Sequence, residues 1–299
     1  MTNSEKIRRK ALSLGFDLCG IACCRSLERQ YDRFKNWLAD GCDGGLEYLR
    51  RNTGKRFDPG ALCEGARSVI VCGVGYHRPP SAHEVASRIA SYAHSRDYHL
   101  TIRERLNELS AYLRELVPGA SGRVFTDTAP LAEKSWAVEA GLGWIGRNSL
   151  LANPRLGSFL LLGEVVTTAE LEPDAPFVRD GCGTCRACVD ACPVAAIRPD
   201  RTIDAGRCIS RRTIETGDGD EGDLHGWLFG CDVCQRACPY NRKAPVSVND
   251  SFAPLAELER LDVDDWLGLD EAGFRRIFGE TPLARCGLRR LQERIRRLK

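Results

Sequence analysis

Apolar residues recur at helical or strand spacing throughout the first 170 residues of the chain. Between 102 and 116, isoleucine and leucine recur every three or four residues, which predicts a long amphipathic helix over 99–117. The runs SVIVCGV at 68–74 and SFLLLGEVVTT at 158–168 are rich in β-branched residues and predict buried strands. The same criteria predict further helices at 4–14, 26–41, 46–51 and 130–140 and further strands at 16–23 and 123–126.

The order of these elements predicts a mixed domain followed by two smaller parts. Helices and strands alternate along 1–170, a pattern typical of an α/β (α+β) domain. The segment LEPDAPFVRD is rich in proline and acid and marks a linker into a cysteine-rich module at 171–245. The remaining residues, 246–299, are polar and predict a short helical C-terminus.

Two cysteine runs dominate the middle of the chain. The run GCGTCRACVDACP has the spacing C-x2-C-x2-C-x3-C-P, and CDVCQRACP repeats most of it. This spacing is the bacterial ferredoxin pattern for [4Fe–4S] clusters, in which the last cysteine of a run ligates the other cluster. Two runs therefore predict a ferredoxin-like module with two clusters and eight ligands. The runs supply seven cysteines, and Cys208 is the one further cysteine between them.

This spacing assigns the eight cysteines to two sets. We expect one cluster on Cys182, Cys185, Cys188 and Cys238, and the other on Cys192, Cys208, Cys231 and Cys234. Pairs of the form C-x2-C also bind structural zinc, but zinc does not need the crossed Cys-Pro arrangement. The other seven cysteines lack ligand spacing, so we expect them to be small buried hydrophobic residues.

Composition and charge narrow the class of protein. The chain has 299 residues, 43% of them hydrophobic, but no run approaches the 18 apolar residues of a membrane span. The N-terminus is charged and has no apolar secretion signal, so we expect a cytoplasmic protein whose thiols stay reduced. The segment 285–299 carries seven Lys or Arg against one Glu, which fits either a solvated helix face or a phosphate-binding patch.

Three further motifs have more than one interpretation. The segment GLGWIG at 141–146 matches a dinucleotide fingerprint, but it follows a helix and precedes a strand, which favours a tight turn. Asp127 lies between a strand and a helix, where it could cap the helix. Asp97, Tyr98 and His99 begin the long helix, so Asp97 could be a cap, or the three could donate protons in a pocket. Spacing alone decides neither case.

Several segments together resemble the epoxyqueuosine reductase family over roughly residues 5–245. The matching segments are KRFDP at 55–59, DYH at 97–99, DTAP at 127–130 with Glu133, GLGWIGRNSLL at 141–151, GSFLLLGE at 157–164, both cysteine runs, and Cys208 with TIE at 213–215. The resemblance implies that the N-terminal domain binds cobalamin and that the clusters relay electrons to its cobalt. It also implies reduction of epoxyqueuosine at the tRNA wobble position, giving queuosine and water.

The resemblance also implies roles for individual residues. Asp127 matches the family's catalytic acid, and such an acid needs a raised pKa from burial to hold its proton. The cobalamin contacts that match are Arg56, Asp127, Asn148, Ser149, Ser158 and Asp232. The expected partners are tRNA carrying epoxyqueuosine in its anticodon loop and an unidentified electron donor, with no membrane and a monomeric protein.

The chain departs from the family pattern in places that bear on tRNA binding. Arg211 and Arg212 replace the tyrosine and leucine that are common in the family, and the loop TGDGDEGD at 216–223 is unusually acidic. Two alternative functions stay open at this point. One is a related cobalamin and iron–sulfur reductase of the reductive dehalogenase type, and the other is an electron carrier with no substrate of its own.

Overall fold

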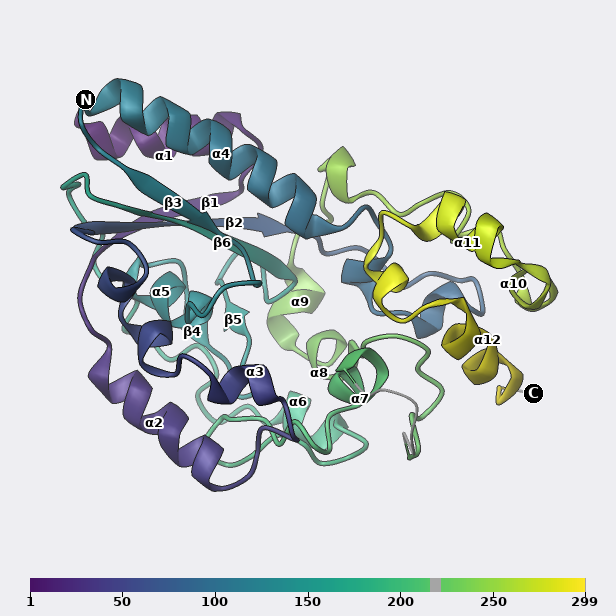
Figure 1. Ribbon diagram of the computed structural model, residues 1–299. Coiled ribbons are helices and arrows are strands. Elements are labelled where there is room, and N and C mark those ends of the chain that lie inside the picture. The colour runs from purple at the N-terminus through teal and green to yellow at the C-terminus, as the bar shows by residue number, and fades with distance from the viewer. Residues whose placement is uncertain (216–221, 299) are drawn as a thin grey trace.

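The N-terminal part is built around a four-stranded antiparallel sheet with strand order β1-β2-β6-β3 (Figure 1). The computed structural model describes residues 1–215 and 222–298. The central strands β2 and β6 pair along their whole length, from Ser68 opposite Thr167 to Gly75 opposite Leu160. The strands of this sheet are β1 (Leu18–Cys23), β2 (Ser68–Gly75), β3 (Gly122–Phe125) and β6 (Leu160–Thr167).

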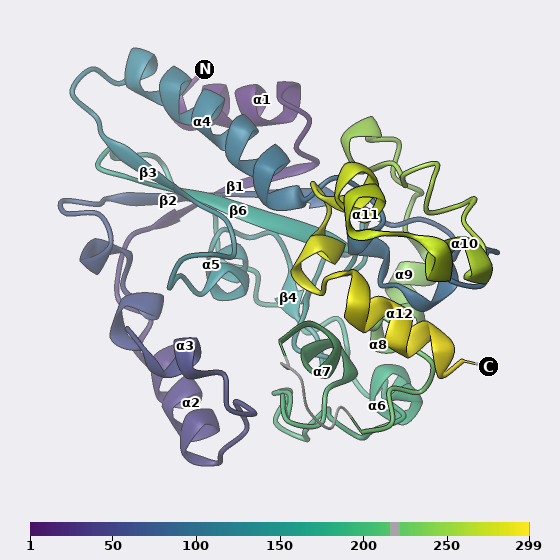
Figure 2. The ribbon, with the colours of Figure 1, turned by 45° about the vertical axis from the view of Figure 1, so that its right-hand side comes forward.

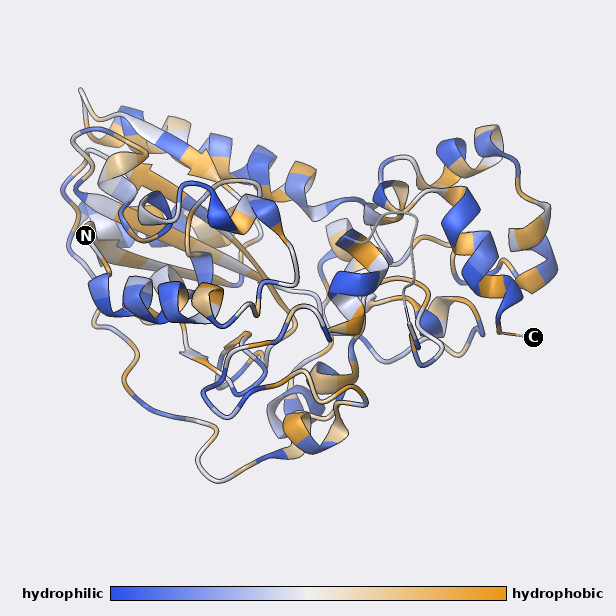
Figure 3. Cartoon of the chain, turned by 60° about the horizontal axis from the view of Figure 1, so that its bottom comes forward, coloured by the Kyte–Doolittle hydropathy of each residue, from blue (hydrophilic) through white to orange (hydrophobic). Residues whose placement is uncertain are grey.

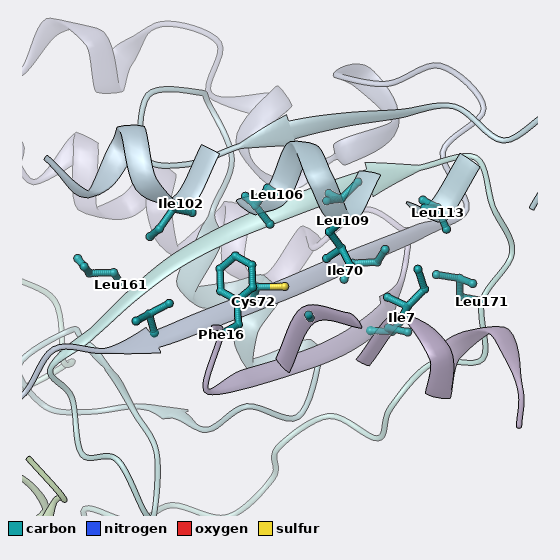
Figure 4. Packing of buried hydrophobic residues seen from close by; sticks show 14 of the residues in the cluster. Ile7, Phe16, Ile70, Cys72, Ile102, Leu106, Leu109, Leu113, Leu161 and Leu171 are labelled. Atoms are coloured by element: carbon teal, nitrogen blue, oxygen red, sulfur yellow. The ribbon is translucent and has the colours of Figure 1, made fainter. Parts of the chain in front are cut away.

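Helices α1 (Asn3–Ser13) and α4 (Tyr98–Leu116) lie side by side over one face of the sheet (Figure 1). Their apolar side chains pack on the strands around Ile70 and Leu106, both fully buried (Figure 4). Full burial of a leucine or isoleucine side chain stabilises a fold by about 1.5–3 kcal/mol. At Gly163 a Cβ atom would lie only 2.6 Å from Ile102, so glycine is what lets α4 pack this closely on β6.

The opposite face of the sheet is covered by α5 and by the segments around α2 and α3. Trp136 of α5 is fully buried there, together with Val69, Val71 and Val166 of the strands. The GLGWIG segment turns the chain from α5 into a small two-stranded sheet, as predicted. The elements on this side are α2 (Glu28–Ala39), α3 (Glu47–Arg50), α5 (Glu133–Glu139), β4 (Trp144–Ile145) and β5 (Leu151–Ala152).

The cysteine module and the C-terminal helices lie next to each other at one end of the sheet (Figure 2). The C-terminal helices share a hydrophobic cluster, around Trp266 and Phe278, with Ile89 and Phe229 from earlier in the chain. This part of the fold is therefore assembled from three distant segments. Its helices are α6 (Ala187–Ala191), α7 (Ile209–Glu215), α8 (Val233–Arg236), α9 (Pro239–Lys243), α10 (Val263–Gly268), α11 (Glu271–Phe278) and α12 (Leu288–Arg296).

The predicted fold class is confirmed, and the sheet is of the α+β type because every strand pair in it is antiparallel. Helices are striped with polar and apolar residues while the strands are mainly apolar (Figure 3). None of the helices in the described ranges is long and apolar enough to cross a membrane. The acidic loop predicted at 216–223 falls mostly on 216–221, outside the described residues.

Two details of the sequence-based prediction are wrong. The helix expected from 130 begins only at Glu133, and its N-cap position is Ala132, which makes no side-chain cap. Of the seven cysteines expected to be buried, Cys23 is exposed, and Cys19 and Cys24 are partly exposed. Cys23 is the last residue of the edge strand β1, where its side chain reaches the surface.

Candidate active site and cysteine module

A cavity of about 330 Å³ lies where four parts of the chain meet. The start of α4, the loop after β3, the end of α7 and the segment 279–285 contribute its walls. The sequence alone does not reveal this site, because its lining residues are spread along the chain from Tyr92 to Arg285. Its lining includes Asp127 and the Tyr98 and His99 side chains that bond it.

Asp127 projects from the loop after β3 in a left-handed backbone conformation, with φ of 50°. Its carboxylate accepts hydrogen bonds from the Tyr98 hydroxyl at 3.0 Å and from Nε2 of His99 at 3.3 Å. Its backbone N–H donates to Oε1 of Glu133. The side chain remains 57% exposed, so a substrate in the cavity can reach it. Asp127 is not the N-cap of α5, and that interpretation of its position is wrong.

His99 is held between two carboxylates. Asp97 caps α4 by accepting the N–H of His99 and also contacts Nδ1 of the same residue at 2.6 Å. The His99 ring stacks on Tyr98 with centroids 4.1 Å apart. Burial alone would lower the pKa of His99, but its hydrogen bonds to Asp127 and Asp97 outweigh burial and raise the pKa to about 9. At neutral pH His99 is therefore an imidazolium that donates from both nitrogens.

The hydrogen bond from His99 holds the pKa of Asp127 below its usual range, against the opposing effect of burial. The Tyr98 hydroxyl acts in the same direction. The expected rise in the pKa of Asp127 is therefore wrong, because sequence reasoning considered burial and not a cation delivered by α4. Asp127 and His99 together still hold one transferable proton, which resides on the imidazole.

An ion pair crosses the opposite side of the cavity. Arg285, in the C-terminal segment, lies 2.8 Å from Glu215 at the end of α7. A second cavity of about 260 Å³ shares Ile214 and Glu215 with the first and reaches Tyr48 and Arg211. These contacts join the C-terminal part, the cysteine module and the N-terminal domain at one place.

The residues predicted to contact a cofactor fall into two groups. Arg56 lies in a short 3-10 helix (Gly54–Phe57) and donates to the Tyr48 carbonyl at 3.0 Å. Asn148 and Ser149 lie in the turn after β4, where the Ser149 carbonyl accepts from Lys134 at 2.8 Å. Nε of Arg56 is buried and has no hydrogen-bond partner among the described residues, and the same is true of Nε of Arg211. Both guanidinium groups thus keep a donor for a ligand.

Ser158 and Asp232 are instead bonded within the protein. The Ser158 hydroxyl accepts from the Asn241 amide at 2.9 Å, and Oδ2 of Asp232 accepts from the Ser91 hydroxyl at 2.6 Å. Both side chains are buried, at 4% and 1% exposure. Ser158 therefore joins the start of β6 to Asn241 of α9, and Asp232 joins the cysteine module to the segment around Ser91.

The eight predicted ligand cysteines gather into two neighbouring groups. Burial raises the pKa of Cys188, and the nearby thiols of Cys182 and Cys238 raise it further. Burial likewise raises the pKa of Cys231 to about 12, with contributions from Cys208 and Cys192 of the same set. In the described ranges, no three His, Cys, Asp or Glu side chains gather closely enough for a single metal ion.

Trp144 is a residue near the cysteines that sequence reasoning missed. Its indole N–H donates to the sulfur of Cys182 at 3.4 Å. The ring is held edge-on by Tyr240, with centroids 4.8 Å apart, and it lies against Gly181, where any Cβ would approach to 2.2 Å. Trp144 stands inside the GLGWIG segment, whose aromatic residue was the available signal.

Comparison with known proteins agrees with this geometry. Residues 181–241 match the family described as "4Fe-4S double cluster binding domain", which favours iron–sulfur clusters over zinc. An α+β domain with a proton-donating cavity next to such a module defines an iron–sulfur oxidoreductase. Residues 56–128 match the family described as "Epoxyqueuosine reductase QueG, DUF1730".

Similar proteins extend the match over nearly the whole chain. An epoxyqueuosine reductase of Cyclobacterium marinum is 40% identical, covering 98% of this chain and 96% of that protein, and one of Leadbetterella byssophila is 36% identical, covering 98% and 97%. The chain belongs to the epoxyqueuosine reductase family. A solved epoxyqueuosine reductase with an epoxyqueuosine-modified tRNA stem loop superposes with a TM-score of 0.87 at 26% identity, covering 97% of this chain and 79% of that one.

A reductive dehalogenase structure shares the fold more distantly. It superposes with a TM-score of 0.50 at 17% identity, covering 99% of this chain and 36% of that one. The similarity to this class is therefore one of backbone fold only.

Proposed function

We propose that this protein reduces epoxyqueuosine to queuosine at the wobble position of tRNA. The observation that carries the proposal is the cavity in which Asp127, Tyr98 and His99 face one another, beside a two-cluster module. A cavity with its own proton donors is what a reductase needs and a simple electron carrier does not. The carrier alternative is therefore the weaker one.

The reaction has a simple balance. Removing the epoxide oxygen breaks two C–O bonds, forms one C=C bond and releases the oxygen as water. It consumes two electrons and two protons. The protein must therefore deliver electrons one at a time to a buried site and must place acids against an oxygen that develops negative charge.

The electrons are proposed to enter through the two clusters. Cys182, Cys185, Cys188 and Cys238 would hold one, and Cys192, Cys208, Cys231 and Cys234 the other. Cys188 contributes to the raised pKa of Cys234 in the other set, so the two sets are neighbours. Coordination to a cluster would offset the rise in pKa that burial causes in these thiols, because metal-bound thiols are deprotonated outright.

Cobalamin is proposed to bind between the clusters and Asp127. When bound, it supplies a strongly reducing cobalt centre that accepts electrons from the clusters and acts on the epoxide. The unpartnered Nε donors of Arg56 and Arg211 suit the amide side chains of this cofactor. Arg211 lines the second cavity, and Arg56 donates to the carbonyl of Tyr48, which also lines it. Asn148 and Ser149 are proposed as further contacts, whereas Ser158 and Asp232, which are buried and bonded within the protein, are proposed to shape the site by holding the surrounding segments.

The proton is proposed to come from the Asp127–His99 pair. Asp127 contacts the epoxide oxygen and passes on the first of the two protons, which His99 supplies through the hydrogen bond between them. The second proton comes from solvent. Tyr98 orients the carboxylate by donating to the same oxygen atom. A positioned acid of this kind contributes typically 10²–10⁴-fold to a rate.

The substrate is proposed to be tRNA presenting its anticodon loop to the cavity. The solved relative bound to a modified stem loop supports this class of substrate. Arg285 lines the cavity, and the exposed Arg289, Arg296 and Arg297 lie further along the C-terminal segment, where they are suited to phosphate contact.

The test is reconstitution with both clusters, cobalamin, a chemical reductant and an epoxyqueuosine-containing anticodon stem-loop. We expect queuosine as the product, detected by mass spectrometry of the digested RNA. The variant Asp127→Asn should bind cobalamin, seen in the visible spectrum, yet lose at least about 10²-fold in turnover. Absence of queuosine from fully loaded wild-type protein would contradict the proposal, and full activity of Asp127→Asn would remove Asp127 from its role.

A further inference from the structure

Glu164 is an acidic residue in the interior of the central sheet. It lies on β6, where it pairs with Val71 on one side and Phe125 on the other. Its side chain is completely buried, and neither carboxyl oxygen has a hydrogen-bond partner of ordinary geometry among the described residues. An ionised carboxylate in such a place is very costly, and the proposed reaction gives it no role.

The strand register decides which way Glu164 points. Successive side chains of a strand alternate between the two faces of a sheet. Leu162 and Val166 belong to the cluster beneath α5, whereas Leu161 and Val165 pack on α4. Glu164 therefore points toward α5, whose first residue is Glu133.

The group that Glu164 meets there is the carboxyl of Glu133. Two carboxyl groups in contact cannot both be ionised in a buried site, so the pair must share a proton. Burial first, and then the charges of Glu133 and Asp127, raise the pKa of Glu164 well above its ordinary value. Glu164 is completely buried whereas Glu133 is partly exposed, so Glu164 is the member that holds the proton.

Glu133 in turn holds the loop that carries Asp127. Its Oε1 accepts the backbone N–H of Asp127, the residue with φ of 50°. A non-glycine residue in this region costs about 1–3 kcal/mol unless its surroundings hold it there. The chain of contacts runs from the sheet interior through Glu164 and Glu133 to the backbone of the proposed acid.

We propose that Glu164 is a positioning residue that, by keeping a proton shared with Glu133, holds Asp127 in its reactive conformation. This rests on the proposed function of Asp127. The charged and titratable groups that face the pair come from α4, α5 and the loop after β3, namely Tyr98, His99, Lys134 and Asp127, whereas Cys72 of β2 lies on the other face of the sheet. Loss of the shared proton at high pH would place two carboxylates together and push Glu133 away from the Asp127 N–H.

Two substitutions distinguish the effect of the shared proton from the effect of side-chain size. Glu164→Gln keeps the size and keeps a donor for Glu133, so we expect activity close to that of the wild type. Glu164→Met keeps the length but removes the donor, and we expect kcat to fall about 10–100-fold while KM for the stem-loop stays unchanged. A role in folding alone would not separate these two variants. Equal losses in both, or a wild-type kcat in Glu164→Met, would overturn the proposal.

A second measurement does not depend on activity. Infrared spectroscopy of the wild-type protein at pH 8 should show the carbonyl stretch of a protonated carboxyl group, and Glu164→Gln should lack it. If the band is absent from the wild type or persists in Glu164→Gln, Glu164 does not hold the proton and the proposal fails. If the wild type shows the band but makes no queuosine, the proposed function fails while the protonation of Glu164 stands.

Discussion

Asp97, His99 and Asp127 form a row in which one imidazolium is shared by two carboxylates. Because hydrogen bonds to both acids raise the pKa of His99 to about 9, the proton is present below that pH and is lost as the pH rises through it. At neutral pH the site therefore holds a transferable proton on His99, although Asp127 itself is ionised. The row explains how a carboxylate with a lowered pKa can serve as an acid.

The row predicts a specific pH dependence. We expect kcat for queuosine formation to fall as the pH rises through about 9. Asp97→Asn removes one of the two acids that raise the pKa of His99, so the fall should move to lower pH. Asparagine is also a good N-cap, so α4 should keep its stability. A pH–rate profile of both proteins decides the matter, and an unmoved profile in Asp97→Asn would contradict the role of the row.

Trp144 predicts an effect on a single cluster. Hydrogen bonds to cluster sulfurs help to set the reduction potential, and a donor favours the more negative, reduced state. Trp144→Phe removes the N–H that bonds Cys182, so the reduction potential of that cluster should fall. For a one-electron couple, a tenfold change in the equilibrium constant for reduction corresponds to ~59 mV. Tyr240→Phe is the matched control, because it alters the contact to the Gly181 carbonyl and leaves the indole donor.

The measurement is a redox titration followed by electron paramagnetic resonance. The second cluster should keep its potential in both variants. Equal potentials in the wild type and Trp144→Phe would show that the indole donor has no electronic effect.

At the scale of elements, periodicity and spacing predicted most of what local sequence can specify. The helix expected at 99–117 is α4 (Tyr98–Leu116), and the strand expected at 158–168 contains β6. Cysteine spacing likewise identified the two-cluster module. The contacts of Glu164 with Glu133 and of Trp144 with Cys182 could not be predicted, because each depends on how distant elements pack. The possible role of Asp127 as a helix cap, one of two interpretations, is wrong for a related reason: α5 begins at Glu133, whose side chain accepts the Asp127 N–H instead.

The packing of α4 on β6 predicts a cost for any side chain at Gly163. In Gly163→Ala the new Cβ would lie 2.6 Å from Ile102 and 2.7 Å from Leu106. Crowding in a packed core costs about 1–3 kcal/mol, so the melting temperature should fall. Gly268→Ala is the control, since nothing lies within 4 Å of its Cβ position. Thermal unfolding followed by circular dichroism tests this, and equal melting temperatures would contradict tight packing at this strand.

At the scale of the whole molecule, the basic C-terminus divides into structural and surface arginines. Arg294 is 3% exposed and donates to the Leu228 carbonyl at 2.6 Å, so it supports the fold. Arg289, Arg296 and Arg297 are exposed on α12 or just beyond it, and Arg290 is half-buried. The choice between a solvated face and a phosphate-binding patch therefore concerns these four residues.

We expect replacement of Arg289, Arg290, Arg296 and Arg297 by Ala to weaken stem-loop binding and to flatten its salt dependence. Each phosphate that is no longer neutralised by an arginine should reduce the slope of log affinity against log salt by about 0.7–0.9. Replacement of Lys6, Arg9 and Lys10 on α1, which lies over one face of the sheet and away from the C-terminal helices (Figure 1), is the control. Binding measured at several salt concentrations tests this, and an unchanged slope would leave the C-terminus as a solvated face.

Because the segment 279–285 forms one wall of the cavity, the cavity is completed only late in synthesis of the chain. Asp127, His99 and the cysteine runs all leave the ribosome well before this segment does. The cavity cannot close until Arg285 has emerged and reached Glu215. Between the emergence of Cys238 and that of Arg285, the chain therefore has its redox ligands and its acids but no enclosed chamber in which they can act together.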